Sequence, residues 1–291
     1  MRLGDFYKEV VRCGIDRDPR KFGVGHFEDS KILYGNPDLD IRKIMIGIDI
    51  EVGELLLADR IRREKGLDLV LSHHPEGEAL AGLTQVMRLQ IDILMRLGLA
   101  RKLAQELLEE RMREVDRRIM PANLMRSVDA ARLLDLPFMC AHTPADNHVA
   151  YFLEQVFKKE KPKKVKDIVD IISEMPEYAQ AKRNLNGPRI ILGGPNREVG
   201  KIFLEMTGGT EGSKEAYEPL QKKGIRTLVV MHLSEEHFKK VKDVNLNVVV
   251  AGHISSDTLG LNLLLDRIEA KAGYPFDVTE CSGFRRVRRN I

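Results

Sequence analysis

Two adjacent histidines at the end of an apolar stretch constrain this chain more than any other feature. Leu67–Leu71 is apolar and predicts a buried strand, which runs into His73 and His74 before Pro75 stops it. Imidazole is the commonest side-chain metal ligand, and α/β proteins place their chemistry at the ends of buried strands. The alternative interpretation is that both histidines only cap the strand with polar groups.

The segments before the histidine pair predict a βαβ unit. Ile44–Asp49 is apolar and β-branched, as expected of a buried strand. Val52–Glu64 has the three- and four-residue apolar spacing of a helix, and Gly66 is well placed to end it. Two strands joined in this way should be parallel, with a right-handed crossover.

The rest of the chain alternates predicted strands and helices, which favours an α/β fold. Residues 76–136 have a mostly helical pattern, and the turn Gly193–Asn196 is expected to start a helix that reaches Met206. A last helix is expected over Asp257–Ala270, with Ser255 or Ser256 as its N-cap. Further strands are expected at Pro137–Ala141, Arg189–Leu192, Arg226–Met231 and Asn247–Ala251.

A lysine-rich run predicts a domain boundary. Lys158–Lys166 holds six lysines and a proline in nine residues, which is typical of an exposed linker. We therefore expect residues 1–157 and 246–291 to form a discontinuous metal-binding α/β domain. Residues 158–245 should form a second α/β domain, and both sheets should be mixed and largely parallel.

Two more predicted strands end as the first one does. One ends at His142, with Asp146 four residues later in a predicted loop over residues 142–147. The other ends at His253, with Asp257 four residues later. Because parallel strands of one sheet bring their carboxyl ends to a common edge, we expect these side chains to meet the histidine pair in one cleft.

The residue types in this set indicate a dinuclear metal site. Imidazole and carboxylate without thiolate suit Zn, Fe, Mn or Ni. His253 and Asp257 can face one ion, and Asp146 can bridge two ions through its two oxygens. Neighbours in an extended chain point to opposite sides, so His73 and His74 suit two different ions. Two such ions can lower the pKa of a bridging water and stabilise a hydrolytic transition state.

Other polar features have two interpretations each. His142 could orient Asp146 by a hydrogen bond from outside the ligand set, or it could be a strand-end histidine only. The glycine clusters near residues 193 and 208 could bind phosphate, or they could form ordinary turns. Four arginines in the C-terminal tail could touch nucleic acid, or they could be solvated or contact another subunit: Arg285, Arg286, Arg288 and Arg289.

The composition excludes several functional classes. A formal net charge of +3 over 291 residues does not by itself favour nucleic acid as a partner. No window approaches 18 uninterrupted apolar residues, so we expect no membrane span. Three widely spaced cysteines indicate a reducing compartment. Since the N-terminus also lacks a signal-peptide pattern, we expect a cytoplasmic protein.

Four short segments stand out together: Gly47–Asp49, Asp68–Pro75, Ala141–Asp146 and Gly252–Asp257. In this order they resemble the Nif-three-like family, which includes the bacterial YbgI proteins. Members of that family are described as homologues of type 2 GTP cyclohydrolase I. The resemblance covers most of residues 39–75, 137–157 and 189–269.

The resemblance implies a Nif-three-like α/β fold, two divalent metal ions per subunit and a toroidal homohexamer. This chain departs from the family pattern where Asp257 stands in place of Glu. The stretch between Pro75 and Ala141 is longer and more helical, and the N-terminal Trp-Asp-Asn-x-Gly-type signature is missing. The resemblance assigns metal-ligand roles to His73, His74, Asp146, His253 and Asp257.

Together, these observations predict a dinuclear metal-dependent hydrolase of a small, nucleotide-like substrate, which the family resemblance makes GTP cyclohydrolase-like. The alternative is a metal-binding regulatory or chaperone-like protein with no turnover of its own. No residue in the sequence stands out as a general acid, so both readings stay open. The sequence leaves the identity of the metal and of the substrate open too.

Overall fold

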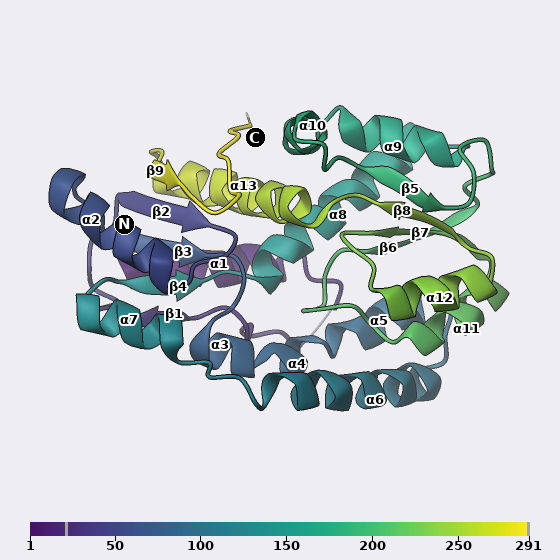
Figure 1. Ribbon diagram of the computed structural model, residues 1–291, viewed down its shortest axis with the longest axis horizontal. Helices are drawn as coiled ribbons and strands as arrows, with labels where there is room; N and C mark the ends of the chain where they lie inside the picture. The colour runs from purple at the N-terminus through teal and green to yellow at the C-terminus, as the bar shows by residue number, and fades with distance from the viewer. Residues whose placement is uncertain (21–22, 290–291) are drawn as a thin grey trace. The chain divides into compact units, whose positions relative to one another are not determined.

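Two sheets organise the chain in the computed structural model, which describes residues 1–20 and 23–289 (Figure 1). They belong to two compact units. Unit 1 comprises Met1–Val86, Asp116–His148 and Asp257–Ile291, and unit 2 comprises Met87–Val115 and Val149–Ser256. The units reflect internal packing, and the domain division expected from the sequence stays a prediction.

Both halves of the chain contain helices and strands. The first half contains α1 (Leu3–Ile15), β1 (Ile32–Tyr34), β2 (Lys43–Gly47), α2 (Val52–Lys65), β3 (Leu69–Ser72), α3 (Gly77–Ala81), α4 (Leu83–Val86), α5 (Leu89–Arg96), α6 (Arg101–Ile119), α7 (Arg126–Leu134), β4 (Phe138–Cys140) and α8 (Thr143–Glu160). The second half contains α9 (Val165–Ser173), α10 (Pro176–Arg183), β5 (Arg189–Leu192), β6 (Lys201–Glu205), the 3-10 turn η1 (Lys214–Ala216), α11 (Tyr217–Lys222), β7 (Ile225–Val230), α12 (Glu235–Asp243), β8 (Asn247–Val250), α13 (His253–Ala272) and β9 (Asp277–Glu280).

The sheet of unit 1 has the strand order β1-β4-β3-β2-β9. Only β1 is antiparallel to its neighbour, and the other pairs are parallel. The parallel pairing of β2 with β3 confirms the predicted βαβ unit, in which Ile44 lies opposite Leu69. Helix α2 ends at Gly66, whose φ of 77° is a conformation that glycine adopts without strain.

The central strands of the sheet of unit 1, β2, β3 and β4, are largely buried because they are apolar on both faces. Side chains that alternate along each strand point to opposite faces. Met45, Val70 and Phe138 pack in one core cluster with residues of α2 and α7, which also contact each other. Full burial of a side chain of this size stabilises the fold by about 1.5–3 kcal/mol. This core fixes the carboxyl ends of β3 and β4, where residues of the candidate site lie.

Helices α8 and α13 touch closely in unit 1. A Cβ atom added to Gly260 would lie only 2.5 Å from the carbonyl oxygen of Ala145, a distance that real Cβ contacts do not reach. Only glycine therefore allows the two helices to approach so closely at this point. Asp146 follows Ala145, and Asp257 precedes Gly260 by about one helical turn, so this contact controls the separation of the two carboxylates.

The sheet of unit 2 has the order β5-β8-β7-β6, and β6, β7 and β8 are parallel. The segment that was expected to be a helix reaching Met206 instead contains β6. Its residues pair with β7, and the buried Phe203 joins a core cluster with Tyr217 and Leu220. This segment is a strand because it pairs with β7, and the local sequence pattern contains no sign of that pairing.

Three further expectations are wrong. Strand β8 lies in the second sheet, so the strand before His253 does not share a sheet with β3 and β4. Helix α8 begins at Thr143, so residues 142–147 are not a loop. Helix α13 begins at His253, so neither Ser255 nor Ser256 is its N-cap; both hydroxyls instead donate hydrogen bonds to the Gly252 carbonyl inside the first turn.

The C-terminal tail is held by ion pairs of Arg286 and Arg288 and by a hydrogen bond from the backbone N–H of Arg289 to Asp266. Residues 290–291 lie outside the part of the chain that the structure describes. The buried guanidinium of Arg286 contacts the carboxylates of Asp266 and Glu269, and Arg288 also contacts Glu269. These pairs favour a structural role for this part of the tail. Within residues 1–20 and 23–289, no helix has the length and apolar character needed to cross a membrane.

We predict that Gly260→Ala destabilises the protein by about 1–3 kcal/mol, because its methyl group would be forced against Ala145. Urea denaturation measures the change. Gly53→Ala is the matched control: it also lies in a helix, but nothing lies within 4 Å of the added methyl group. The control should be neutral or stabilising by up to about 1 kcal/mol. An equal effect of both substitutions would contradict the close contact of α8 with α13.

Candidate metal centre

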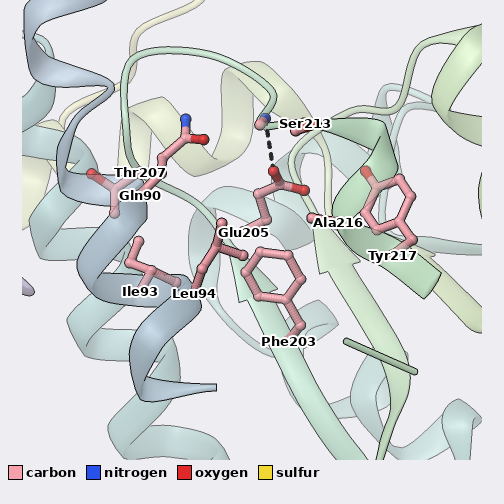
Figure 2. A pocket seen from close by; sticks show the side chains of 10 residues that line it. Gln90, Ile93, Leu94, Phe203, Glu205, Thr207, Ser213, Ala216 and Tyr217 are labelled. Atoms are coloured by element: carbon pink, nitrogen blue, oxygen red, sulfur yellow. Dashed lines mark hydrogen bonds between the residues drawn. The ribbon is translucent and has the colours of Figure 1, made fainter. Parts of the chain in front are cut away.

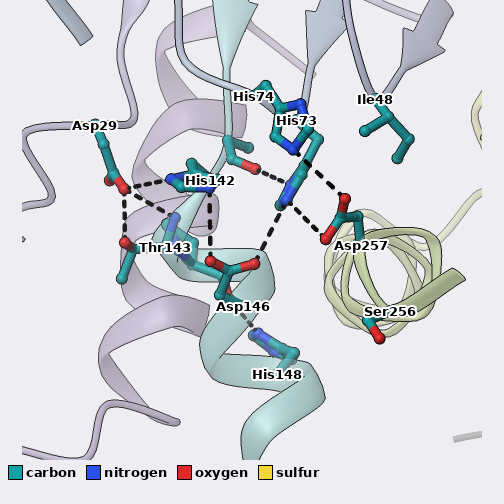
Figure 3. Close-up of polar contacts among 12 residues, drawn as sticks. Asp29, Ile48, His73, His74, His142, Thr143, Asp146, His148, Ser256 and Asp257 are labelled. Atoms are coloured by element: carbon teal, nitrogen blue, oxygen red, sulfur yellow. Dashed lines mark hydrogen bonds and ion pairs between the residues drawn. The ribbon is translucent and has the colours of Figure 1, made fainter. Parts of the chain in front are cut away.

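Two groups of side chains in unit 1 could each hold a metal ion. The first consists of His73, His74 and Asp257, and the second of His73, His142 and Asp146. Within each group, the ligand atoms all lie within 4.8 Å of one another. Figure 3 shows the side chains converging from the ends of β3 and β4 and from helices α8 and α13.

The backbone holds the histidine pair at the end of β3. The N–H of His73 donates to the Gly47 carbonyl and that of His74 to the Ile48 carbonyl, each at 2.9 Å, so the pairing with the β2 segment continues past the strand. The hydroxyl of Ser72 donates to the carbonyl of His74 at 2.7 Å. Both imidazoles are therefore placed by fixed main-chain geometry.

Each of the three imidazoles donates its Nδ1–H to a fixed oxygen. His73 donates to the Ala141 carbonyl at 3.1 Å, and His74 donates to the Asp49 carboxylate at 2.6 Å. His142 donates to the Asp29 carboxylate at 2.8 Å. Such partners fix the ring orientation and the tautomer of metal-binding histidines. In all three rings the lone pair of neutral imidazole is therefore left on Nε2.

Asp29 is the most firmly held of these partners. Its carboxylate is fully buried. It accepts hydrogen bonds from the hydroxyl of Thr143 at 2.6 Å and from the Thr143 backbone N–H at 3.3 Å, in addition to the bond from His142. Asp29 thus joins the loop before β1 to the first turn of α8. It orients His142 and the start of the helix that carries Asp146.

The two carboxylates lie between the Nε2 atoms. Asp257 places one oxygen 3.5 Å from Nε2 of His73 and the other 3.5 Å from Nε2 of His74. Asp146 places its oxygens 3.4 Å from His73 and 3.6 Å from His142. These separations are too long for good hydrogen bonds. They leave room for a cation between donor atoms of opposite kinds.

Buried polar atoms in this cluster fit a cation. Nε2 of His73 and Oδ1 of Asp146 are out of contact with solvent and have no hydrogen-bond partner among the described residues. A buried polar atom without a partner destabilises a fold by about 1–3 kcal/mol. Imidazole and carboxylate donors without thiolate suit Zn, Fe, Mn or Ni. The residues present therefore fit divalent metal ions.

The electrostatics of the cluster also favour a cation. Burial lowers the pKa of His73, but Asp257 and Asp146 outweigh burial and raise the pKa to about 10. Burial likewise lowers the pKa of His74, whereas Asp257 and Asp49 raise it to about 9. The carboxylates thus impose a strong negative potential on both rings. A positive charge at this point, whether a proton or a metal ion, is stabilised.

His73 belongs to both groups, which limits how the groups can be filled. Its Nδ1 is engaged with Ala141, so only Nε2 can bind, and one nitrogen lone pair serves one ion. With two ions present, one of them must use other ligands in place of His73. We assign His73 to the ion near His142 and His74 to the other ion. This assignment agrees with the expectation that the two histidines bind different ions, and that expectation stays a prediction.

The structure brings together four of the five predicted ligands: His73, His74, Asp146 and Asp257. His253 is in neither group; it lies in unit 2, where its ring faces that of His232 at a centroid distance of 4.7 Å. Its role as a ligand stays a prediction. His142, for which the sequence suggested an outer role, presents Nε2 in the same way as the other two imidazoles.

Sequence reasoning missed Asp29 and did not assign Asp49 a role. Asp29 lies 113 positions before His142, and no local spacing links the two residues. Asp49 is the last residue of the predicted strand Ile44–Asp49, and it follows β2 at the same sheet edge as the histidine pair. The position of Asp49 after a buried strand is a signal that could have found it, because parallel strands bring their carboxyl ends together.

Comparisons with known proteins give a clear match at the level of structure. A NIF3 superfamily protein from Sphaerobacter thermophilus matches with a TM-score of 0.79 and 25% sequence identity, over 95% of this chain and 98% of that one. No family model matches the sequence, and the search of curated proteins gave no match.

Two more distant structures show the same fold. Reduced HcgD from Methanocaldococcus jannaschii matches with a TM-score of 0.57 and 15% identity, over 96% of this chain and 97% of that one. The protein ybgI, whose function is described as unknown, matches with a TM-score of 0.56 and 12% identity, over 97% and 98%. At these identities the likeness concerns the fold alone.

We predict that the double variant His73→Ala/His74→Ala loses more metal than His73→Ala/His142→Ala, because Nε2 of His73 can bind only one ion and is assigned to the ion near His142. Elemental analysis of protein purified without a tag and reloaded with Mn, Fe or Zn measures the ions per chain. Equal losses in the two double variants would contradict this assignment of His73.

Asp29→Asn is expected to weaken metal binding by about 10–100-fold, because His142 and Thr143 lose the carboxylate that orients them. Competition with a chromogenic chelator measures the affinity. Asp38→Asn is the control, since this carboxylate is exposed and pairs only with Arg2 in the described contacts. An unchanged affinity in Asp29→Asn, with normal thermal unfolding, would remove Asp29 from the account.

Proposed function

The chain belongs to the NIF3 superfamily, and from this premise we propose that it is a dinuclear metal-dependent hydrolase of a small, nucleotide-like substrate. One observation carries the proposal: three imidazoles with fixed Nδ1 groups and two carboxylates meet in one place in unit 1. Divalent ions held by such a set lower the pKa of bound water and stabilise the negative charge that develops during hydrolysis.

The protein itself provides positioning and a dry environment. His73 is fully buried, and Asp146 is nearly so. Their partners are main chain or buried side chain, so little reorganisation accompanies binding. A preorganised, water-poor site strengthens electrostatic stabilisation of a transition state.

The side of the centre near His74 is the open one within unit 1. The His74 side chain is 24% exposed, and that of its partner Asp49 is 57% exposed. A substrate would approach from this side. The exposed carboxylate of Asp49 accepts the hydrogen bond from Nδ1–H of His74 and holds this imidazole in place. Among the acidic side chains described at the centre, that of Asp49 is the most exposed.

Other parts of the proposal come from the family resemblance. GTP cyclohydrolase-like chemistry and a homohexamer are proposed from the family resemblance. A cytoplasmic location is proposed from the composition. His253 is proposed as a further ligand, with Asp257 in the place of the family's Glu.

A second candidate is a metal-binding regulatory or chaperone-like protein without turnover. The burial of the second group favours it, because His73, His142 and Asp146 are all buried. A centre closed on that side could store or sense an ion without admitting a substrate. The two candidates predict different outcomes in one experiment.

A hydrolase screen of the metal-loaded protein separates the two candidates. GTP, other nucleotides and phosphoesters are offered with added Mn, Fe or Zn. We expect turnover of a nucleotide-like substrate, and we expect Asp146→Asn and His74→Ala to reduce kcat at least about 100-fold, since each removes a ligand of the centre. Asp38→Asn should keep full activity.

Turnover that persists in both ligand variants would show that the centre is not the active site. Stoichiometric metal binding without any turnover across the screen would favour the regulatory candidate. Metal content close to zero in the wild-type protein after loading would contradict both candidates.

A further inference from the structure

At the end of β6 in unit 2, only one of the two carboxyl oxygens of Glu205 has a hydrogen-bond partner among the described residues. Oε1 of Glu205 accepts a hydrogen bond from the backbone N–H of Gly212 at 2.9 Å. Oε2 is out of contact with solvent and has no hydrogen-bond partner among the described residues. An ionised carboxylate in this state would be strongly disfavoured, because a buried charge needs several partners.

The space beside Glu205 is too small for a ligand. Figure 2 shows the carboxyl group among the side chains that line this cavity. The cavity has a volume of about 20 Å³, which has room for one water molecule. Neither a hydrated cation nor an organic molecule fits there. The side chains around it are both apolar and polar: Ile93, Leu94, Phe203 and Ala216 on the one hand, and Gln90, Thr207, Ser213 and Tyr217 on the other.

The loop of residues 206–213 closes tightly around this carboxyl group. The side-chain amide of Gln90 donates to the carbonyls of Gly208 and Thr210 at 2.8 and 2.9 Å. A Cβ atom added to Gly212 would lie 2.7 Å from Oε1 of Gln90 and 3.0 Å from Oε1 of Glu205. Only a glycine at this position lets the loop pack onto both side chains.

Several charged groups surround Glu205. Burial raises its pKa most, the Gly212 N–H lowers it, Glu211 raises it, and His232 and Arg111 lower it; the result is a pKa of about 7. Glu211, on the same loop, keeps its charge: burial raises its pKa, but His232 and the Ser234 N–H outweigh burial and bring it to about 2.

The remaining titratable neighbours hold each other. The hydroxyl of Tyr217 lies 2.7 Å from Nδ1 of His237. Burial is the largest of the causes that raise the pKa of Tyr217, and Glu205 adds to it, so the phenol stays neutral. Burial lowers the pKa of His237, so this imidazole also favours its neutral form. Neither side chain supplies a positive charge to Glu205.

We propose that Glu205 is a proton-controlled latch for the loop of residues 206–213, which closes over the neutral carboxyl group and opens when that group ionises. In the closed loop an ionised Glu205 would be stabilised only by the Gly212 N–H and by a cavity with room for one water molecule. In the open loop it would be solvated. Glu211 lies on the same loop, so opening would also take its carboxylate away from His232 and Ser234.

The direction of the pH dependence follows from linkage. The closed form binds the proton more tightly than a solvated carboxyl group with its ordinary pKa of 4.5. The closed loop is therefore most stable below that value. Its stability falls as the pH rises from about 4.5 to 7, by up to about tenfold in the open-to-closed ratio per pH unit, and levels off above that range.

Amide hydrogen exchange at Gly212 tests the latch in the full-length protein. The protection factor, corrected for the intrinsic exchange rate, should fall by up to about tenfold per pH unit between pH 5 and 7 and then level off. In Glu205→Gln it should stay nearly constant, because the amide side chain is neutral and can still accept from Gly212. Glu218→Gln, an exposed carboxylate of α11 paired with Lys222, should behave as wild type.

A wild-type protection factor that does not change with pH would overturn the proposal, as would a Glu205→Gln variant that follows the wild-type profile. If Glu205→Gln does not fold, the carboxyl ¹³C signal of Glu205 in the wild-type protein decides. Titration near pH 7, together with the change in Gly212 protection, supports the latch, and titration near pH 4.5 excludes it.

Discussion

The hydrogen bonds from three imidazole Nδ1 groups to fixed oxygens are the constraint on which the candidate centre depends. The partners are the carbonyl of Ala141 and the carboxylates of Asp49 and Asp29. With Nδ1 occupied, each ring can offer only Nε2, and all three Nε2 atoms face Asp146 or Asp257. Two other features of unit 1 hold these side chains in position. The buried sheet fixes two strand ends, and the close contact at Gly260 sets the distance between the helices that carry the carboxylates.

The local parts of this fold could be predicted from the sequence. The βαβ unit follows from apolar periodicity, and Gly66 ends α2 as expected. The histidine pair was placed correctly at the end of β3. Each of these features depends on residues close together in the chain, where spacing and steric preference carry the information.

Features that depend on distant pairing could not be predicted. An apolar strand does not reveal which sheet it joins, so β8 was wrongly expected in the same sheet as β3 and β4. The β6 segment was taken for a helix because its partner β7 lies beyond a glycine-rich loop and another helix. The short strands β1 and β9 gave no recognisable pattern. Asp29 reaches His142 across 113 positions and could not be linked to it by spacing.

Anomalous X-ray scattering from crystals of the metal-loaded protein would show directly whether these side chains bind metal ions. Data at the absorption edges of Mn, Fe, Ni and Zn locate and identify bound ions together. We expect ions between the Nε2 atoms of the histidines and the carboxylates of Asp146 and Asp257, with each Nδ1 still hydrogen-bonded to its present oxygen partner. Ions bound only elsewhere, or bound through Nδ1 after loss of the Asp29 or Asp49 contact, would contradict it.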